Sequence, residues 1–346
     1  MTALRLIILS INENASDICN PLWYTHERKS MKKKSSGFKK FFYINSAAFA
    51  GLYLINRSIS LSVPKSTLKL EDGGYYRWKY GKVFYTITGS GSKPLLLIHD
   101  ANEYGSAEEW HFLAKNLAAD YRIWLLDLPG CGRSDKPAYT YTNYFYTLLV
   151  SSFIRDVIRE KADVCASGLS STFPLMASLE APDQIGNIYM ISPCSLKLLQ
   201  NTPDERSVVL RILSQIPVIG TTIYHLSTIR PNIEYLLKEK YFYNPFQVPA
   251  GMMEACYEAS HLSKGKGKYL LASLRGGYLY WDIRRALKQT SSPITIINGE
   301  KTEHAAGIAE AYRKYNASIR VCSVSNAKLL PHMEMPAQTA NIILSE

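Results

Sequence analysis

The sequence lacks the residue groupings that hold metals or disulfides. Its six cysteines are scattered along 346 residues, with no pair at the short spacing of a zinc site or a disulfide framework. Two of them, Cys165 and Cys322, fall inside apolar runs, where a thiol acts as a small hydrophobic side chain. The seven histidines show no metal-site spacing either. We therefore expect no metal and no cofactor.

Acidic residues are scarce near the N-terminus. Residues 1–60 hold nine Lys and Arg against three Asp and Glu, so this segment contributes more than half of the net charge of +11. Such a basic excess is typical of the flank of a membrane segment. No zinc-finger spacing or basic-aromatic recognition motif accompanies it. We expect a membrane as a partner and no nucleic acid.

One apolar stretch follows the basic residues. Phe41–Ile55 is interrupted mainly by Asn45 and Ser46, a length that fits a short membrane anchor or a signal segment. We favour an uncleaved anchor with the N-terminus in the cytoplasm and the main domain outside it. The alternatives are cleavage near Ala50, which gives a secreted protein, and an amphipathic helix docked on a cytoplasmic domain.

The first thirty residues show no periodicity. We expect residues 1–30 to be a non-native or disordered extension, with Met31 as the natural first residue. Residues 31–61 then form the basic segment with its apolar stretch, and residues 62–346 form the main domain. Retention of Thr2–Ser30 in the intact mass of the natural protein would contradict a start at Met31.

The main domain alternates strand and helix patterns. Short continuous apolar runs predict strands buried on both faces, and an alternating aromatic stretch predicts a hairpin. The hairpin falls at 75–88, the buried strands at 94–99, 122–127, 163–166 and 188–191, and the helices between them at 108–117, 143–159 and 173–180. This alternation predicts a mostly parallel, doubly wound α/β sheet.

The strand pattern stops in the second half of the chain. Helical stretches dominate from about residue 194 to 289, which predicts a helical cap inserted over the sheet. Strand patterns resume at 293–299 and 319–324, before a C-terminal helix.

Two stretches resemble the α/β-hydrolase family, in its esterase and lipase-like branch with a helical cap. They read LLLIHDANEYGSAEEW at 95–110 and LLDLPGCGRSDKP at 125–137. The resemblance covers about residues 75–346. It implies an eight-stranded, mostly parallel sheet, an active site at the carboxyl ends of the strands, and a cap that shapes the pocket.

The family places its nucleophile on a Gly-x-Ser-x-Gly elbow between a strand and a helix. The corresponding stretch here is ASGLSS, residues 166–171. In the favoured register Gly168 stands at the nucleophile position, since Pro182 and Pro193 then fall where the family ends the next helix and strand. In the alternative register Ser170 is the nucleophile, and the downstream elements come two residues early.

The other two triad positions are also changed. Thr302 stands where the family usually has its aspartate, and threonine cannot carry the charge that stabilises an imidazolium. Leu329, counted back from Pro336, stands at the position of the catalytic histidine. Nearby, Glu303 is expected to be a solvated loop carboxylate and His332 a structural hydrogen-bonding residue.

The oxyanion region differs as well. The His-Gly pair of the family appears as His99-Asp100. An ionised aspartate there would repel the negative charge that develops during acyl transfer. The backbone N–H groups of Ala101 and Leu169 are expected to keep their directions, because they do not depend on side chains.

These changes together favour a hydrolase relative that has lost serine-hydrolase chemistry. We expect it to bind a small apolar ligand or a protein partner, whose identity the sequence leaves open. The cap supplies aromatic side chains for such a cavity: Tyr224, Tyr235, Tyr241 and Tyr243.

Two alternatives remain. One is an active ester hydrolase with a relocated triad of Ser170, His332 and Glu303. It requires a hydrogen bond from Ser170 to His332 and another from His332 to a carboxylate. The other is a structural interaction module with a filled core and no cavity.

Overall fold

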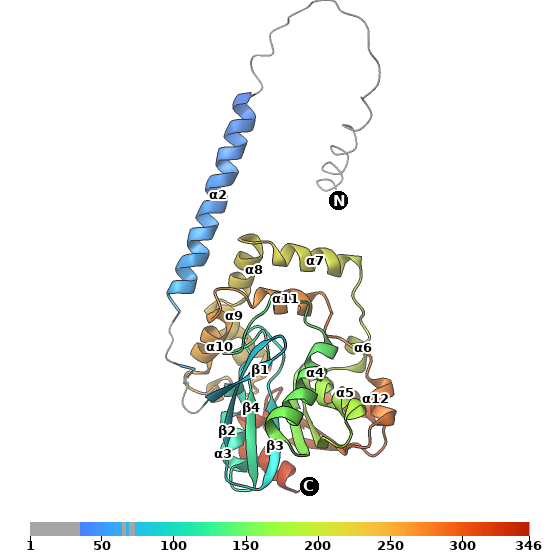
Figure 1. Cartoon of the computed structure of the whole chain (residues 1–346). Helices are drawn as coiled ribbons and strands as arrows, with labels where there is room; N and C mark the ends of the chain where they lie inside the picture. The colour runs from blue at the N-terminus through green and yellow to red at the C-terminus, as the bar shows by residue number, and fades with distance from the viewer. Residues whose placement is uncertain (1–34, 64–66, 69–72, 346) are drawn as a thin grey trace, which may run out of the picture. The chain divides into compact units, whose positions relative to one another are not determined.

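A computed structural model describes residues 35–63, 67–68 and 73–345 (Figure 1). The predictions for residues 1–30 and for the lysines at 32–34 lie outside the described residues. The chain divides into two compact units, with the boundary between Ala48 and Phe49, inside helix α2 (Ser35–Leu61). The described part of the first unit is the N-terminal portion of α2. The second unit holds the rest of that helix and the whole α/β domain.

The stretch predicted as a membrane segment is helical. Along α2 the side chains of Phe41, Phe42 and Ile44 in the first unit, and of Leu54 in the second, are largely exposed. Among the described residues no single helix is long and apolar enough to cross a membrane, although α7 (Glu205–Gln215) and α8 (Ile219–Ser227), bent by 97°, pass that test as a pair.

The sheet has eight strands in the order β1-β2-β4-β3-β5-β6-β7-β8. From β4 to β8 all neighbours are parallel, and β2 pairs antiparallel with both β1 and β4. The mostly parallel sheet expected from the sequence is therefore confirmed. The strands are β1 (Gly73–Trp78), β2 (Gly81–Thr88), β3 (Lys93–Ile98), β4 (Tyr121–Leu126), β5 (Ala162–Ser167), β6 (Ile185–Ile191), β7 (Ile294–Gly299) and β8 (Arg320–Val324).

Helices cover both faces of the sheet because the central strands alternate apolar side chains between two cores. On β3, Leu95 and Leu97 join one core, and Leu96 and Ile98 join the other. The first core is closed by α3 (His111–Leu117) and α15 (Pro336–Leu344). The second is closed by α4 (Asn143–Phe153) with its π-helical end η2 (Ile154–Ile158), α5 (Thr172–Glu180), α12 (Arg284–Gln289) and α13 (Ala305–Arg313).

The predicted helical insertion lies between β6 and β7. Its helices are α6 (Leu196–Leu199), α7, α8, α9 (Arg230–Tyr235) continued by η4 (Leu236–Tyr241), η5 (Pro245–Gln247), α10 (Met252–His261) and α11 (Lys268–Arg275). The last helix of the predicted cap, α12, instead packs against α5 beside the sheet. Helical spacing alone does not tell which layer a helix joins. The expected boundary at about residue 289 therefore included α12 in the cap, whereas this helix packs against α5.

Candidate functional site

The strand-to-helix elbow lies at the carboxyl end of β5. Gly168 follows the strand with φ +54°, a left-handed conformation that suits glycine, and begins the short 3-10 helix η3 (Gly168–Ser171). This sharp turn at Gly168 agrees with the favoured register. Ser170 lies inside η3, fully buried, and its hydroxyl has no hydrogen-bond partner.

The carboxylate of Asp100 occupies the space beside this elbow. Its Oδ1 accepts a hydrogen bond from the backbone N–H of Leu169 at 2.8 Å, and the N–H of Ser170 donates to the same carboxylate. A Cβ atom added to Gly168 would lie 2.5 Å from Oδ1 and 2.6 Å from Cγ of Asp100. Asp100 therefore fills the volume that a nucleophile side chain would need and accepts the N–H that would serve an oxyanion.

The residues next to Asp100 are fixed by the strand end. His99 is fully buried: its Nδ1 bonds to the carbonyl of Asp100 at 2.8 Å, and its Nε2 accepts from the N–H of Leu128 at 3.0 Å. Burial lowers the pKa of His99, so its ring stays neutral. Ala101 is buried and is not among the residues that line the adjacent cavity.

The structure places the other residues that the family resemblance assigned to the triad as follows. Leu329 lines the same cavity as Gly168, as the favoured register requires, but offers only an apolar side chain. The hydroxyl of Thr302 is buried without a hydrogen-bond partner. Glu303 is exposed at the surface, as expected for a solvated loop carboxylate.

His332 is held by a carboxylate that the sequence analysis did not single out. Its Nε2 lies 3.0 Å from Oε1 of Glu109, and its ring packs on Trp110 with centroids 4.3 Å apart. The hydroxyl of Ser167 donates to the same Oε1 at 2.5 Å. In this chain of contacts the carboxylate stands between serine and histidine, so the histidine cannot accept the serine proton.

The relocated triad is not brought together. His332 contacts Glu109 instead of Glu303, and the hydroxyl of Ser170 has no hydrogen-bond partner at all. The bond that this alternative requires between Ser170 and His332 is thus missing. His332 contacts Glu109 and packs on Trp110.

A buried ion pair fixes the loop that follows β4. Asp127 accepts from Nε of Arg133 at 2.8 Å, from Nη2 at 3.2 Å and from the backbone N–H of Arg133 at 2.7 Å. The same carboxylate accepts from the N–H of Ala107 at 2.6 Å. This network explains the DLPGCGRSDKP stretch: it holds the loop at residues 127–137 against the segment that carries Glu109.

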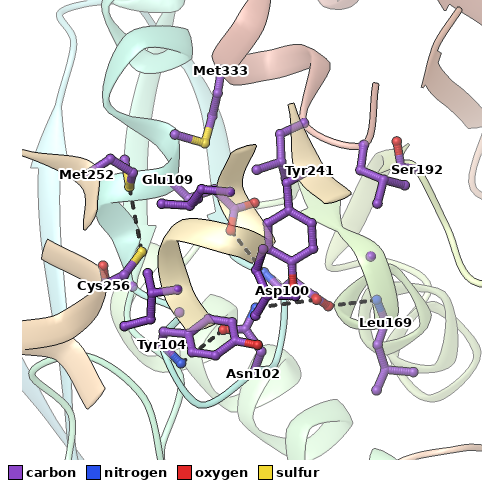
Figure 2. A pocket seen from close by; sticks show the side chains of 18 of the residues that line it. Asp100, Asn102, Tyr104, Glu109, Leu169, Ser192, Tyr241, Met252, Cys256 and Met333 are labelled. Carbon is purple, nitrogen blue, oxygen red and sulfur yellow. Dashed lines mark hydrogen bonds between the residues drawn. The ribbon is translucent and has the colours of Figure 1, made fainter. Parts of the chain in front are cut away.

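A cavity of about 210 Å³ opens above Asp100 (Figure 2). Its described lining comes from the strand ends, from α9, η4 and α10 of the insertion, and from the loop before α14 (Pro331–Glu334). Apolar and sulfur-containing side chains form most of the wall: Leu169, Cys194, Ile233, Leu236, Leu237, Met252, Cys256, Leu329, Leu330 and Met333.

Of the four cap tyrosines expected near a pocket, one lines this cavity. Tyr241 does so, and burial raises the pKa of its hydroxyl. Tyr224 is fully buried and donates to the carbonyl of Ser260 at 2.5 Å, so it belongs to the core of the insertion. Tyr235 and Tyr243 are about half exposed and do not line it.

The two carboxylates at the cavity floor have opposite pKa shifts. Burial, with the nearby charge of Glu109, raises the pKa of Asp100 to about 6, against the effect of the hydrogen bond from Leu169. Burial would also raise the pKa of Glu109, but the hydrogen bond and charge of His332 outweigh it and hold that pKa below its usual value. Both groups are therefore ionised above neutral pH.

Sequence reasoning missed Glu109 and Tyr104. Glu109 follows another glutamate, Glu108, and the two look alike in sequence. The fold separates them: Glu109 faces Ser167 and His332, and Glu108 faces Arg133. The one available signal was the position of Tyr104 and Glu109 within the stretch that carries the family resemblance.

Residues 95–342 match the alpha/beta hydrolase family, so the chain belongs to that family. Epoxide hydrolase 1 of Caenorhabditis elegans is 33% identical over 125 residues, covering 35% of this chain but only 30% of that protein. The fold is shared with epoxide hydrolase CorEH (TM-score 0.65, 15% identity, 79% of this chain and 97% of the other). It is also shared with carboxylesterase CesB of Bacillus subtilis (TM-score 0.60, 16% identity, 86% and 96%).

Proposed function

We propose that this α/β-hydrolase-fold protein has lost serine-hydrolase activity and uses the cavity under its helical insertion to bind a small, largely apolar ligand. The observation that carries the proposal is the pairing of Gly168 with Asp100. The nucleophile position has no side chain, and the carboxylate takes both the space and the Leu169 N–H that acyl transfer would need.

The loss of the other triad groups points the same way. Removing the triad of a serine hydrolase lowers turnover by about 10⁶-fold and leaves only weak catalysis from binding and the oxyanion hole. Here Thr302 and Leu329 stand in place of the acid and the histidine. The carboxylate of Asp100 accepts the hydrogen bond from the Leu169 N–H, which an oxyanion would otherwise receive. An apolar wall with a few polar groups at one end is the usual composition of a small-molecule site.

The test is labelling of the full chain with a fluorophosphonate probe, together with turnover of a short-chain and a medium-chain p-nitrophenyl ester. A known serine hydrolase in the same buffer is the positive control. We expect no labelling and no turnover above buffer. Labelling that disappears in Ser170→Ala would contradict the proposal and establish the relocated triad.

We further propose that the apolar stretch of α2 inserts into a membrane and holds the protein there. The basic residues before Phe41 and the exposed apolar side chains of the helix support this. The full chain should stay with membranes after alkaline carbonate washing, whereas a chain beginning at Ser62 should be released. Release of the full chain by carbonate would contradict the anchor.

A further inference from the structure

The floor and the walls of the cavity differ in chemistry. The described lining includes two carboxylates, Asp100 and Glu109, and no lysine or arginine. The walls are aliphatic, aromatic and sulfur-containing. Figure 2 shows hydrogen bonds that join Asp100 to Leu169 and to Glu109, and Tyr241 lines the same cavity. A ligand in this cavity would meet negative charge at one end and apolar surface elsewhere.

Only one of the two carboxylates contacts a basic side chain. Oε1 of Glu109 lies 3.0 Å from Nε2 of His332, and this contact lowers the pKa of Glu109. The hydrogen bonds of Asp100 come from neutral donors: the backbone N–H groups of Leu169 and Ser170, and the amide of Asn102 at 3.5 Å. Within the part of the chain that the structure describes, no Lys, Arg or His forms an ion pair with Asp100.

An anion in an apolar cavity is costly to keep unless a cation pairs with it. We infer that the ligand of this cavity carries a protonated amine beside an apolar group, with the ammonium on the Asp100 carboxylate. Its apolar part contacts Ile233, Leu237 and Met252. The ring of Tyr241 adds a favourable face for the cation. This inference rests on the proposed function, because an ammonium on Asp100 serves binding and not acyl transfer.

Other ligand classes fit less well. A carboxylate ligand, such as a fatty acid, would be repelled by Asp100 and Glu109 and would find the Leu169 N–H already used. A metal ion lacks a ligand set, because the described residues contain no group of three His, Cys, Asp or Glu side chains placed to share one. An organic ammonium needs only one carboxylate and an apolar wall.

The test compares three probes of one shape by calorimetric titration of the full chain at neutral pH. They are 4-phenylbutylamine, the neutral 4-phenylbutanol and the anionic 4-phenylbutyrate. We expect the amine to bind at least about tenfold more tightly than the alcohol, because only the ammonium pairs with the charge of the carboxylate. The carboxylate should bind most weakly of the three.

The matched variant is Asp100→Asn, which keeps the shape and can still accept from the Leu169 N–H. It should lose the preference for the amine over the alcohol. Equal binding of amine and alcohol by the natural protein would overturn the amine inference and leave the apolar binding site standing. Binding of none of the three probes would overturn the binding site as well.

Discussion

The carboxylate of Asp100 lies beside Gly168, in the space where a side chain at residue 168 would stand. A working serine hydrolase keeps this space free for its nucleophile. A Cβ atom at Gly168 would lie 2.5 Å from Oδ1 of Asp100, so a side chain there requires the carboxylate to move. The two residues are therefore coupled: because residue 168 is a glycine, the carboxylate of Asp100 has room to lie beside it and accept the N–H of Leu169.

The first prediction concerns this coupling. Gly168→Ser should lower the free energy of unfolding by about 2–4 kcal/mol, because the new side chain meets Asp100 and residue 168 has φ +54°. Adding Asp100→Gly removes the contact, so the double variant should be more stable than the sum of the two single effects predicts, by more than about 1 kcal/mol. Denaturant unfolding of the four proteins measures this term.

The strain from the positive φ is present in both the single and the double variant that carry Gly168→Ser, so it cancels from the coupling energy. Two effects that simply add would show that Asp100 does not fill the space beside Gly168.

The second prediction concerns pH. The pKa of Asp100 is raised from 3.8 to about 6 in the folded chain, so the unfolded chain loses this proton first as the pH rises. Ionisation of Asp100 therefore lowers the stability of the natural protein between about pH 4 and pH 6. Asp100→Asn carries no such charge, so its stability relative to the natural protein should rise by about 2 kcal/mol over this range.

Thermal or denaturant unfolding at a series of pH values tests this. Glu109 is present in both proteins, so its own titration largely cancels. Asp120→Asn, at an exposed position, is the control. If the stability difference between Asp100→Asn and the natural protein stays flat from pH 4 to pH 8, ionisation of Asp100 does not destabilise the folded chain, and the prediction is wrong.

The third prediction is that serine-hydrolase reactivity can be introduced only by changing the four positions together. A variant with Asp100→Gly, Gly168→Ser, Thr302→Asp and Leu329→His returns the residues that the family resemblance implies. It should gain fluorophosphonate labelling, whereas Gly168→Ser alone should not, because Asp100 still holds the Leu169 N–H. Labelling of that single variant as strong as that of the fourfold variant would show that Asp100 does not block the site.

The fourth prediction compares two arginines. Arg133→Ala should cost about 3–5 kcal/mol of stability, because it leaves Asp127 buried without its cation. Arg122→Ala is the matched control. Its partner Glu160 is exposed, so the loss should stay below about 1 kcal/mol. Similar losses in the two variants, measured by urea unfolding, would mean that the Asp127 pair does not hold the loop at 127–137.

Much of the fold could be read from local pattern. The apolar runs that became β3 to β7 are nearly continuous because both faces of the sheet are covered, and that pattern needs no knowledge of contacts. The layer occupied by α12 could not be read, since its spacing is helical whether it covers the sheet or joins the insertion. The same holds for the cap tyrosines, where only the packing separates Tyr241 from Tyr224.

The sequence by itself determined the α/β architecture, because the alternation of apolar strand runs and helical stretches follows from residue identity and spacing. The resemblance to the α/β-hydrolase family added the prediction that Gly168, Thr302 and Leu329 stand at the triad positions. Only the tertiary structure decided what lies beside Gly168. Asp100 and Leu169 are 69 residues apart and meet because β3 and β5 are neighbours in the sheet. The direction of a side chain at a strand end depends on that pairing, and no local pattern encodes it.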